Sequence, residues 1–127
     1  MVRAIEILVA VQCLVIGLSH ITQPRAWVEF FIWLRDKGKA GVFINGFLSL
    51  WFGSVIVAFH NVWDGLPAVL TVLGWAQVLK ASVSFVLPQI AMRGLRRVSQ
   101  ERAWEFIVGG VFLVTLSALF CYIALVR

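Results

Sequence analysis

Four long runs of apolar residues alternate with short polar segments along the chain. The runs cover residues 4–21, 41–59, 68–87 and 104–126. A helix rises about 1.5 Å per residue, so each run can cross a hydrocarbon layer about 30 Å thick. The segments between the runs are too short to form a soluble domain. The pattern predicts an all-α fold in which residues 1–127 form a single transmembrane domain, a four-helix transmembrane bundle.

Two of the connecting segments have the pattern of short amphipathic helices. Residues 24–38 and 88–103 both begin with proline and mix apolar with basic side chains, and the first ends at Gly38. Proline is favoured at the first position of a helix, and basic amphipathic helices lie in the membrane interface. We therefore expect an interfacial helix after the first span and another after the third. Residues 60–67 are expected to form a tight turn between the second and third spans.

Composition supports a membrane location, and the charges indicate an orientation. Apolar residues make up 61% of the chain, and the mean hydropathy is +0.95. The net charge of +5 would also fit nucleic-acid binding, but eight of the eleven basic residues lie within residues 22–40 and 88–103, on one side of the membrane. These eight are Arg25, Arg35, Lys37, Lys39, Arg93, Arg96, Arg97 and Arg102. Because an excess of Lys and Arg marks cytoplasmic loops, we expect a multi-pass protein of the cytoplasmic (inner) membrane with both termini outside and no nucleic-acid partner.

The two halves of the chain have a similar order of features. Pro24 and Pro88 are 64 residues apart, and so are Gly46 and Gly110. Each half contains a helix, a proline, a basic amphipathic segment and a second helix. With four spans both halves begin on the same side of the membrane, so the pattern predicts two parallel helical-pair repeats. The alternative is a chance coincidence in a chain rich in small apolar residues.

Lys80 is the one basic residue placed well inside a span. On a helix, Gln77, Lys80 and Ser84 share one face, and the repeat alignment places His20 at the depth of Ser84. These four residues form a candidate intramembrane polar site. A charge inside a span is costly and usually serves a function, but the long lysine stem can also carry its ammonium group to the headgroups. Both interpretations stay open from the sequence.

Small and polar side chains recur along one face of the second span. Small residues let membrane helices approach closely, and a polar side chain can bond across the contact. The predicted packing seam consists of Gly41, Asn45, Gly46, Ser49, Gly53, Gly109 and Gly110. Contact with a substrate is the alternative role for Asn45. In the outer turn the noteworthy residues are His60, Asn61, Trp63 and Asp64, for which turn formation and anchoring at the interface are sufficient roles.

Two short motifs carry a resemblance to a known group of proteins. The stretch FHNVW at residues 59–63, the stretch LGWAQVLK at residues 73–80, and Pro88 resemble a widespread family of small four-span prokaryotic membrane proteins. The resemblance implies two helix pairs that contain proline, with His60, Asn61, Trp63, Trp75 and Lys80 as shared positions. It implies no substrate or cofactor. The chain departs from the family pattern at Ala81, where glycine is expected.

Motifs for catalysis or metal binding are absent from the sequence. It contains no nucleophile elbow, no phosphate-binding loop and no cluster of metal ligands. The two histidines, His20 and His60, are expected to face opposite sides of the membrane, which argues against a haem held within one chain. We therefore expect no catalytic residue, no cofactor and no metal.

Two functions fit these features. The preferred one is a non-catalytic accessory or scaffold subunit that packs against partner membrane proteins or lipids. The alternative is a small oligomeric transporter or channel with a polar lining around Lys80. The expected partners are membrane lipids and either another membrane protein or further copies of the chain.

Overall fold

The computed structural model describes residues 2–126, and this part of the chain is helical with short connections. The elements are α1 (Val2–Thr22), α2 (Pro24–Asp36), α3 (Lys39–Phe59), α4 (Ala68–Val86), α5 (Pro88–Arg96), the 3₁₀ turn η1 (Gln100–Arg102) and α6 (Trp104–Val126). Within the described residues there is no strand. The all-α fold predicted from the sequence is confirmed.

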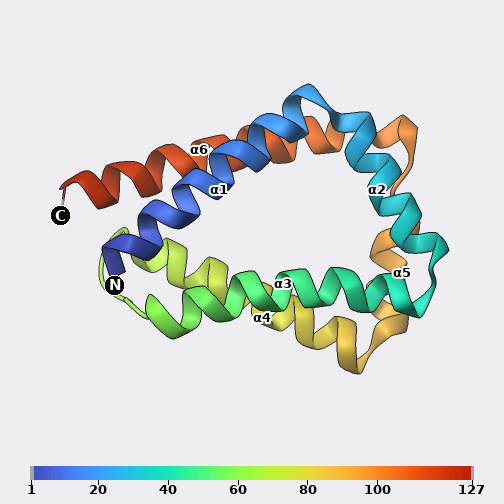
Figure 1. The fold of residues 1–127 in the computed structure, drawn as a ribbon, viewed down its shortest axis with the longest axis horizontal. Coiled ribbons are helices and arrows are strands. Elements are labelled where there is room, and N and C mark those ends of the chain that lie inside the picture. The colour runs from blue at the N-terminus through green and yellow to red at the C-terminus, as the bar shows by residue number, and fades with distance from the viewer. Residues whose placement is uncertain (1, 127) are drawn as a thin grey trace.

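Proline and glycine set the boundaries of the short helices. Pro24 and Pro88 each occupy the start of a helix, where the missing backbone N–H removes no intrahelical bond. Gly38, between α2 and α3, has φ of 64°, a left-handed conformation that other residues adopt at a cost. The chain therefore turns sharply at each end of α2 and at the start of α5, and these short helices lie across the ends of the long ones (Figure 1).

Within residues 2–126, four helices are long and apolar enough to cross a membrane. They are Val2–Thr22, Lys39–Phe59, Ala68–Val86 and Gln100–Val126, the last including the turn η1. About a third or less of each apolar window is buried inside the molecule, so most of its apolar side chains face outward. Lengths and composition are those of a multi-pass membrane protein, as the sequence predicted.

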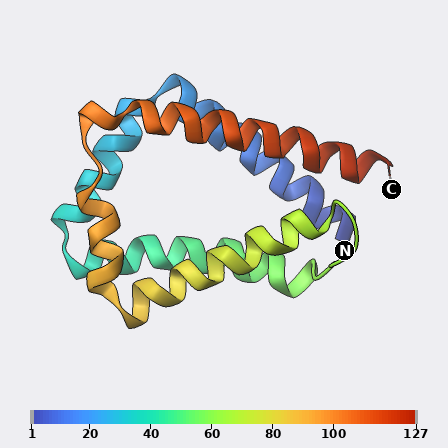
Figure 2. The same cartoon turned by 180° about the vertical axis from the view of Figure 1, so that it is seen from behind.

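The long helices are arranged as two packed pairs. Helix α1 packs along α6, and α3 packs along α4, whereas contacts between the pairs are few. Figures 1 and 2 show the two pairs as the long sides of an elongated frame, which α2 and α5 close at one end. We call this the α2–α5 end. The opposite end, which holds the connection at residues 60–67 and both ends of the described chain, is called the turn end.

Glycines allow close contact within each pair. A Cβ on Gly110 of α6 would lie 2.6 Å from the backbone oxygen of Gly17 on α1. A Cβ on Gly53 of α3 would lie 2.8 Å from the backbone oxygen of Gly74 on α4. Backbone atoms cannot move away as a flexible side chain can, so each contact requires a residue without a side chain.

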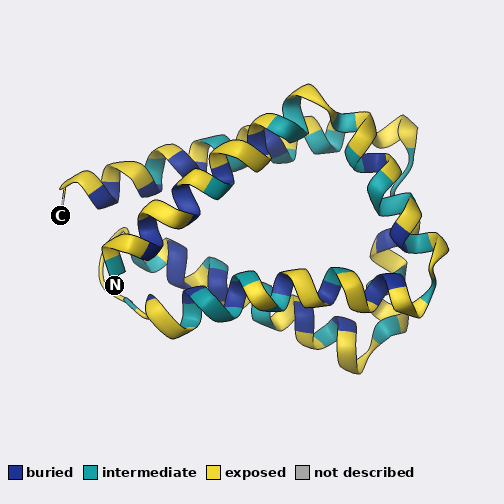
Figure 3. Ribbon diagram, in the orientation of Figure 1, coloured by how far each residue is buried: buried dark blue, intermediate teal, exposed yellow. Residues whose placement is uncertain are grey.

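Two apolar clusters lie toward opposite ends of the frame, and the first of them joins the two helix pairs. The first, toward the turn end, is built from α1, α3, α4 and α6 and includes Val9, Ile56, Leu70 and Phe120. The second, at the α2–α5 end, has Leu34, Val42 and Leu95 at its centre. In Figure 3 the buried residues form bands along the helices that alternate with exposed ones, as expected for helices packed on one side.

Candidate functional site

A cavity of about 690 Å³ lies between the two helix pairs, and we call it the central cavity. Helices α1, α2, α3 and α4 supply its walls, and Leu113 of α6 completes them. Most of the lining is apolar. Its polar members are Gln12, His20, Asn45, Ser49, Gln77 and Lys80. The volume falls within the range of about 300–1,000 Å³ that is typical of small-molecule sites.

Four of the polar lining residues have no partner in the described part of the protein. Within residues 2–126 the side chains of Gln12, Asn45, Gln77 and Lys80 make no hydrogen bond and no ion pair. They come from three helices, α1, α3 and α4, and line one space. Polar groups inside a membrane protein normally bond to one another or to the backbone, because lipid supplies neither donor nor acceptor. This cavity therefore offers unused hydrogen-bonding capacity to a guest.

Lys80 lies on a wall that the central cavity shares with a second one. This side cavity, of about 600 Å³, extends toward α5 and also shares Phe31 and Asn45 with the central cavity. Among the described residues, neither cavity has an Asp or a Glu in its lining. The positive charge of Lys80 is therefore not balanced by any acidic residue lining either space.

The sequence placed Lys80, Gln77, Ser84 and His20 in one polar site, and three of them line the central cavity. Ser84 lines the side cavity next to Lys80 but is itself buried, and its hydroxyl donates to the backbone oxygen of Lys80 at 3.1 Å. It also faces Gly46, on which a Cβ would come within 2.7 Å of the Ser84 Cβ. Ser84 therefore serves helix packing more than the cavity surface.

His20 lies at the junction of α1, α2 and α6. Its ring stacks on Trp27 with centroids 4.2 Å apart and on Phe106 with centroids 5.7 Å apart. The Nδ1 atom is 2.8 Å from the backbone oxygen of Ile16. With one ring nitrogen bonded to its own helix and two aromatic neighbours, His20 has a fixed orientation beside the cavity.

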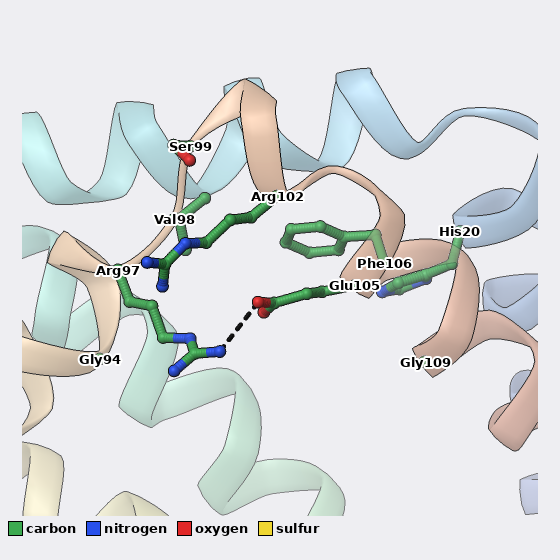
Figure 4. A pocket seen from close by; sticks show the side chains of 9 residues that line it. All are labelled: His20, Gly94, Arg97, Val98, Ser99, Arg102, Glu105, Phe106 and Gly109. Atoms are coloured by element: carbon green, nitrogen blue, oxygen red, sulfur yellow. Dashed lines mark hydrogen bonds and ion pairs between the residues drawn. The ribbon is translucent and has the colours of Figure 1, made fainter.

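A third, corner cavity of about 320 Å³ lies where α5, η1 and α6 meet. Figure 4 shows Arg97 reaching from the end of α5 to Glu105 at the start of α6, with Arg102 and His20 on the same space. The Arg97 guanidinium and the Glu105 carboxylate are 2.9 Å apart. The hydrogen bond and charge of Glu105 raise the pKa of the Arg97 guanidinium above its ordinary value.

A buried polar cluster joins α1 to the α3–α4 connection at the turn end. Nε2 of His60 is 2.9 Å from Oε2 of Glu6, and Nδ1 of His60 is 3.1 Å from the hydroxyl of Thr71. His60 is 0% exposed and Glu6 is 1% exposed, so water reaches neither side chain. The Thr71 hydroxyl donates to the backbone oxygen of Val62 at 2.6 Å and accepts from the Val62 N–H. We call Glu6, His60 and Thr71 the buried polar cluster.

The remaining residues of the predicted outer turn are at the surface. Asn61, Trp63 and Asp64 are exposed, and Oδ1 of Asn61 accepts from the indole N–H of Trp63 at 3.1 Å and of Trp75 at 3.5 Å. These bonds hold two indole rings at the turn end. Only His60 of the predicted turn residues enters the interior of the protein.

The predicted packing seam divides into three groups. Gly46, Gly53 and Gly110 lie at close helix contacts, and Gly41 packs against the backbone of Leu34 at the end of α2. Asn45 and Ser49 line the central cavity. A Cβ on Gly109 would meet nothing within 4 Å, so this glycine lies outside the contact between α1 and α6.

Sequence reasoning missed the pairing of Glu6 with His60 and the place of the Gln12 amide in the cavity wall. Glu6 is a carboxyl group inside a predicted span, and His60 follows the span that ends on the same side of the membrane. Matching polar residues of similar depth on different spans is the signal that identifies this pair. Thr71 carried no comparable signal, because a lone hydroxyl in a span is common. Within residues 2–126, no three His, Cys, Asp or Glu side chains lie close enough to hold a metal ion.

Comparison of the chain with protein-family models, with curated proteins and with solved structures gives no match. The function is therefore argued from the cavities and their lining residues.

Proposed function

We propose that the protein is a non-catalytic accessory or scaffold subunit of a membrane, and that it holds an apolar guest between its two helix pairs. The observation that carries this proposal is the central cavity, which separates the pairs where a self-contained bundle would place a packed core. In a bilayer, such a space is filled by lipid or by an apolar segment of a partner. Van der Waals packing and the free polar groups of the lining would stabilise that guest.

The closed turn end favours a binding role over a conducting one. The apolar cluster around Val9, Ile56 and Phe120 and the buried polar cluster join the helix pairs on this side of the central cavity. A conducting path across the membrane would require the contacts of both clusters to break. The guest is therefore expected to enter from the side, between the helix pairs.

The proposal predicts that the guest copurifies with the protein and is displaced by a larger side chain in the cavity. Asn45 lines both the central and the side cavity, so Asn45→Phe places an aromatic ring where the guest would lie. Extraction in a mild detergent that preserves lipids, followed by native mass spectrometry, is expected to show an added mass on the wild-type chain. In Asn45→Phe, most of the chains are expected to lack this added mass.

The matched control is Ile44→Phe, because Ile44 is the next residue of the same helix and is 41% exposed. This variant is expected to retain the added mass. Thermal unfolding of both variants shows whether the fold is preserved. A wild-type chain that carries no added mass, or an Asn45→Phe variant that folds and retains it, would contradict the proposal.

The polar lining supports a second candidate function, a small oligomeric transporter. Lys80, Gln77 and His20 lie on one cavity at different depths, which is an arrangement that transport through a pore would use. Reconstituted vesicles separate the two functions. A transporter gives a flux that Asn45→Phe abolishes, whereas an accessory subunit gives none.

We also propose the cytoplasmic membrane as the location, with the α2–α5 end in the cytoplasm and both termini outside. The distribution of basic residues supports this orientation, because α2, α5, their flanking turns and the first residue of α3 carry eight of them. In a variant with Cys13→Ala and Cys121→Ala, a cysteine introduced at Lys37 or Arg96 is expected to react with an impermeant reagent only from the cytoplasm. Labelling from the outside would reverse the orientation.

We further propose that the chain is an internal duplication. An offset of 64 residues aligns α1 with α4, α2 with α5 and α3 with α6. Under this alignment, the packed pair α1–α6 corresponds to the packed pair α4–α3. The close approach of Gly110 to His20 corresponds to that of Gly46 to Ser84, with Cβ separations of 2.8 and 2.7 Å. Each packed pair would then contain one helix from each half, related by an axis along the membrane normal.

A further inference from the structure

We propose that the central cavity binds a single-chain amphiphile that carries a carboxylate, and that the carboxylate lies against the ammonium group of Lys80. This inference rests on the proposed function and specifies the guest. It follows from the charge of the lining, from its unused hydrogen-bond donors, and from the size and depth of the space.

The charge of the lining calls for an anion. Among the described residues, Lys80 is the one lysine in the lining of the central and side cavities, and no Arg, Asp or Glu accompanies it there. An ammonium group in apolar surroundings is unfavourable unless it is paired. A bound carboxylate supplies the missing charge, and a charge-assisted hydrogen bond is stronger than one between neutral groups.

The neighbouring amides can complete an anion site. Gln77 is on the same face of α4 as Lys80, and Gln12 and Asn45 line the same cavity from α1 and α3. The amide nitrogens provide donors for carboxylate oxygens, and none of these amides has a partner within residues 2–126. The apolar chain of the guest has Phe31, Leu48 and Phe52 as neighbours in the rest of the lining.

The depth of Lys80 favours a carboxylate over a phospholipid headgroup. Lys80 is eight residues before Pro88, and at about 1.5 Å per residue it lies about 12 Å along the helix from the α2–α5 end. A zwitterionic headgroup moved to this depth would leave several polar groups without partners. A carboxylate has only two oxygens to satisfy, and the lining provides donors for both. The volume of about 690 Å³ accommodates one chain more readily than two.

Binding of a fluorescent fatty acid tests the inference. The full chain is placed in phosphatidylcholine nanodiscs and titrated at mildly alkaline pH with cis-parinaric acid or with its uncharged methyl ester. The wild-type protein is expected to bind the acid about tenfold more tightly than the ester, or better. A hydrogen bond to a charged group gives a difference in affinity of this size. Lys80→Met is expected to remove this preference, and Lys80→Arg to retain most of it.

The matched control is Lys39→Met, which removes a lysine at the start of α3 that lines none of the three cavities. It is expected to keep the preference for the acid. Thermal unfolding of each variant identifies any loss that comes from misfolding, and Lys80→Arg provides a folded comparison at the same position.

The outcomes separate the inference from the function on which it rests. If the acid and the ester bind equally well to the wild-type and Lys80→Met proteins, the cavity holds an apolar guest and the carboxylate assignment is wrong. If neither probe binds and a membrane protein copurifies in the cavity, the guest is a partner helix, so the inference fails while the accessory role stands. If neither probe binds and nothing copurifies, both fail.

Discussion

Replacement of His60 by leucine is expected to lower the free energy of unfolding by about 3–5 kcal/mol, because one member of a buried pair is removed while the other stays buried. An ordinary hydrogen bond between membrane helices contributes less, about 1–2 kcal/mol. The larger figure applies because His60→Leu removes two buried contacts at once, that of Nε2 with Oε2 of Glu6 at 2.9 Å and that of Nδ1 with the Thr71 hydroxyl at 3.1 Å. Unfolding in mixed micelles with a denaturing detergent measures the change.

The double variant Glu6→Leu with His60→Leu provides the internal control for this prediction. With both polar groups gone, apolar side chains fill the site, so the double variant is expected to be less destabilised than either single one. Asp64→Ala, in the same connection but exposed, is expected to change stability by less than about 0.5 kcal/mol. Additive effects of Glu6→Leu and His60→Leu would mean that the two side chains are not coupled.

Gly110→Leu is expected to separate α1 from α6 and to cost at least the upper end of the roughly 1–3 kcal/mol range for overpacked cores. The Cβ would lie 2.6 Å from the backbone oxygen of Gly17 and 2.8 Å from the Cβ of His20, and neither atom can yield without moving a helix. Gly53→Leu is expected to do the same to α3 and α4. The unfolding assay used for His60 gives the size of both effects.

Gly109→Leu is the matched control, because a Cβ on this adjacent glycine would have no neighbouring atom within 4 Å. Leucine is the better helix former, so this variant is expected to be unchanged or more stable by up to about 1 kcal/mol. Equal losses in the Gly109 and Gly110 variants would show that glycine is needed for some reason other than close contact between α1 and α6.

The helices could be predicted from the sequence because their signals are local. Each signal lies within or beside the element that it defines, as the apolar runs, Pro24, Pro88 and Gly38 do. The structure confirms four long apolar helices within residues 2–126. The pairing of these helices is a long-range property, and many apolar faces of similar composition compete for each partner. The repeat pattern grouped the helices by halves, whereas the packing joins α1 to α6 and α3 to α4.

In the candidate site, too, local relationships could be predicted from the sequence and long-range contacts could not. Lys80 and Gln77 share a face of one helix, so their common position beside the cavity follows from helical spacing. His20 joins them through its depth in the membrane, which the positions of the spans already indicated. The contact between Glu6 and His60 joins residues 54 positions apart and depends on the tilt of α1 against α3 and α4, which no local pattern specifies.

The pairing of α1 with α6 has a consequence for biosynthesis. Helix α1 packs against α6, and residues 23–103, which lie between them, must be synthesised before α6 begins. At usual rates of translation this interval is on the order of ten seconds. During that time the face of α1 that carries Gly17 lacks its neighbours on α6. A ribosome that stalls before α6 therefore leaves α1 without its packing partner, whereas α3 and α4 already have each other.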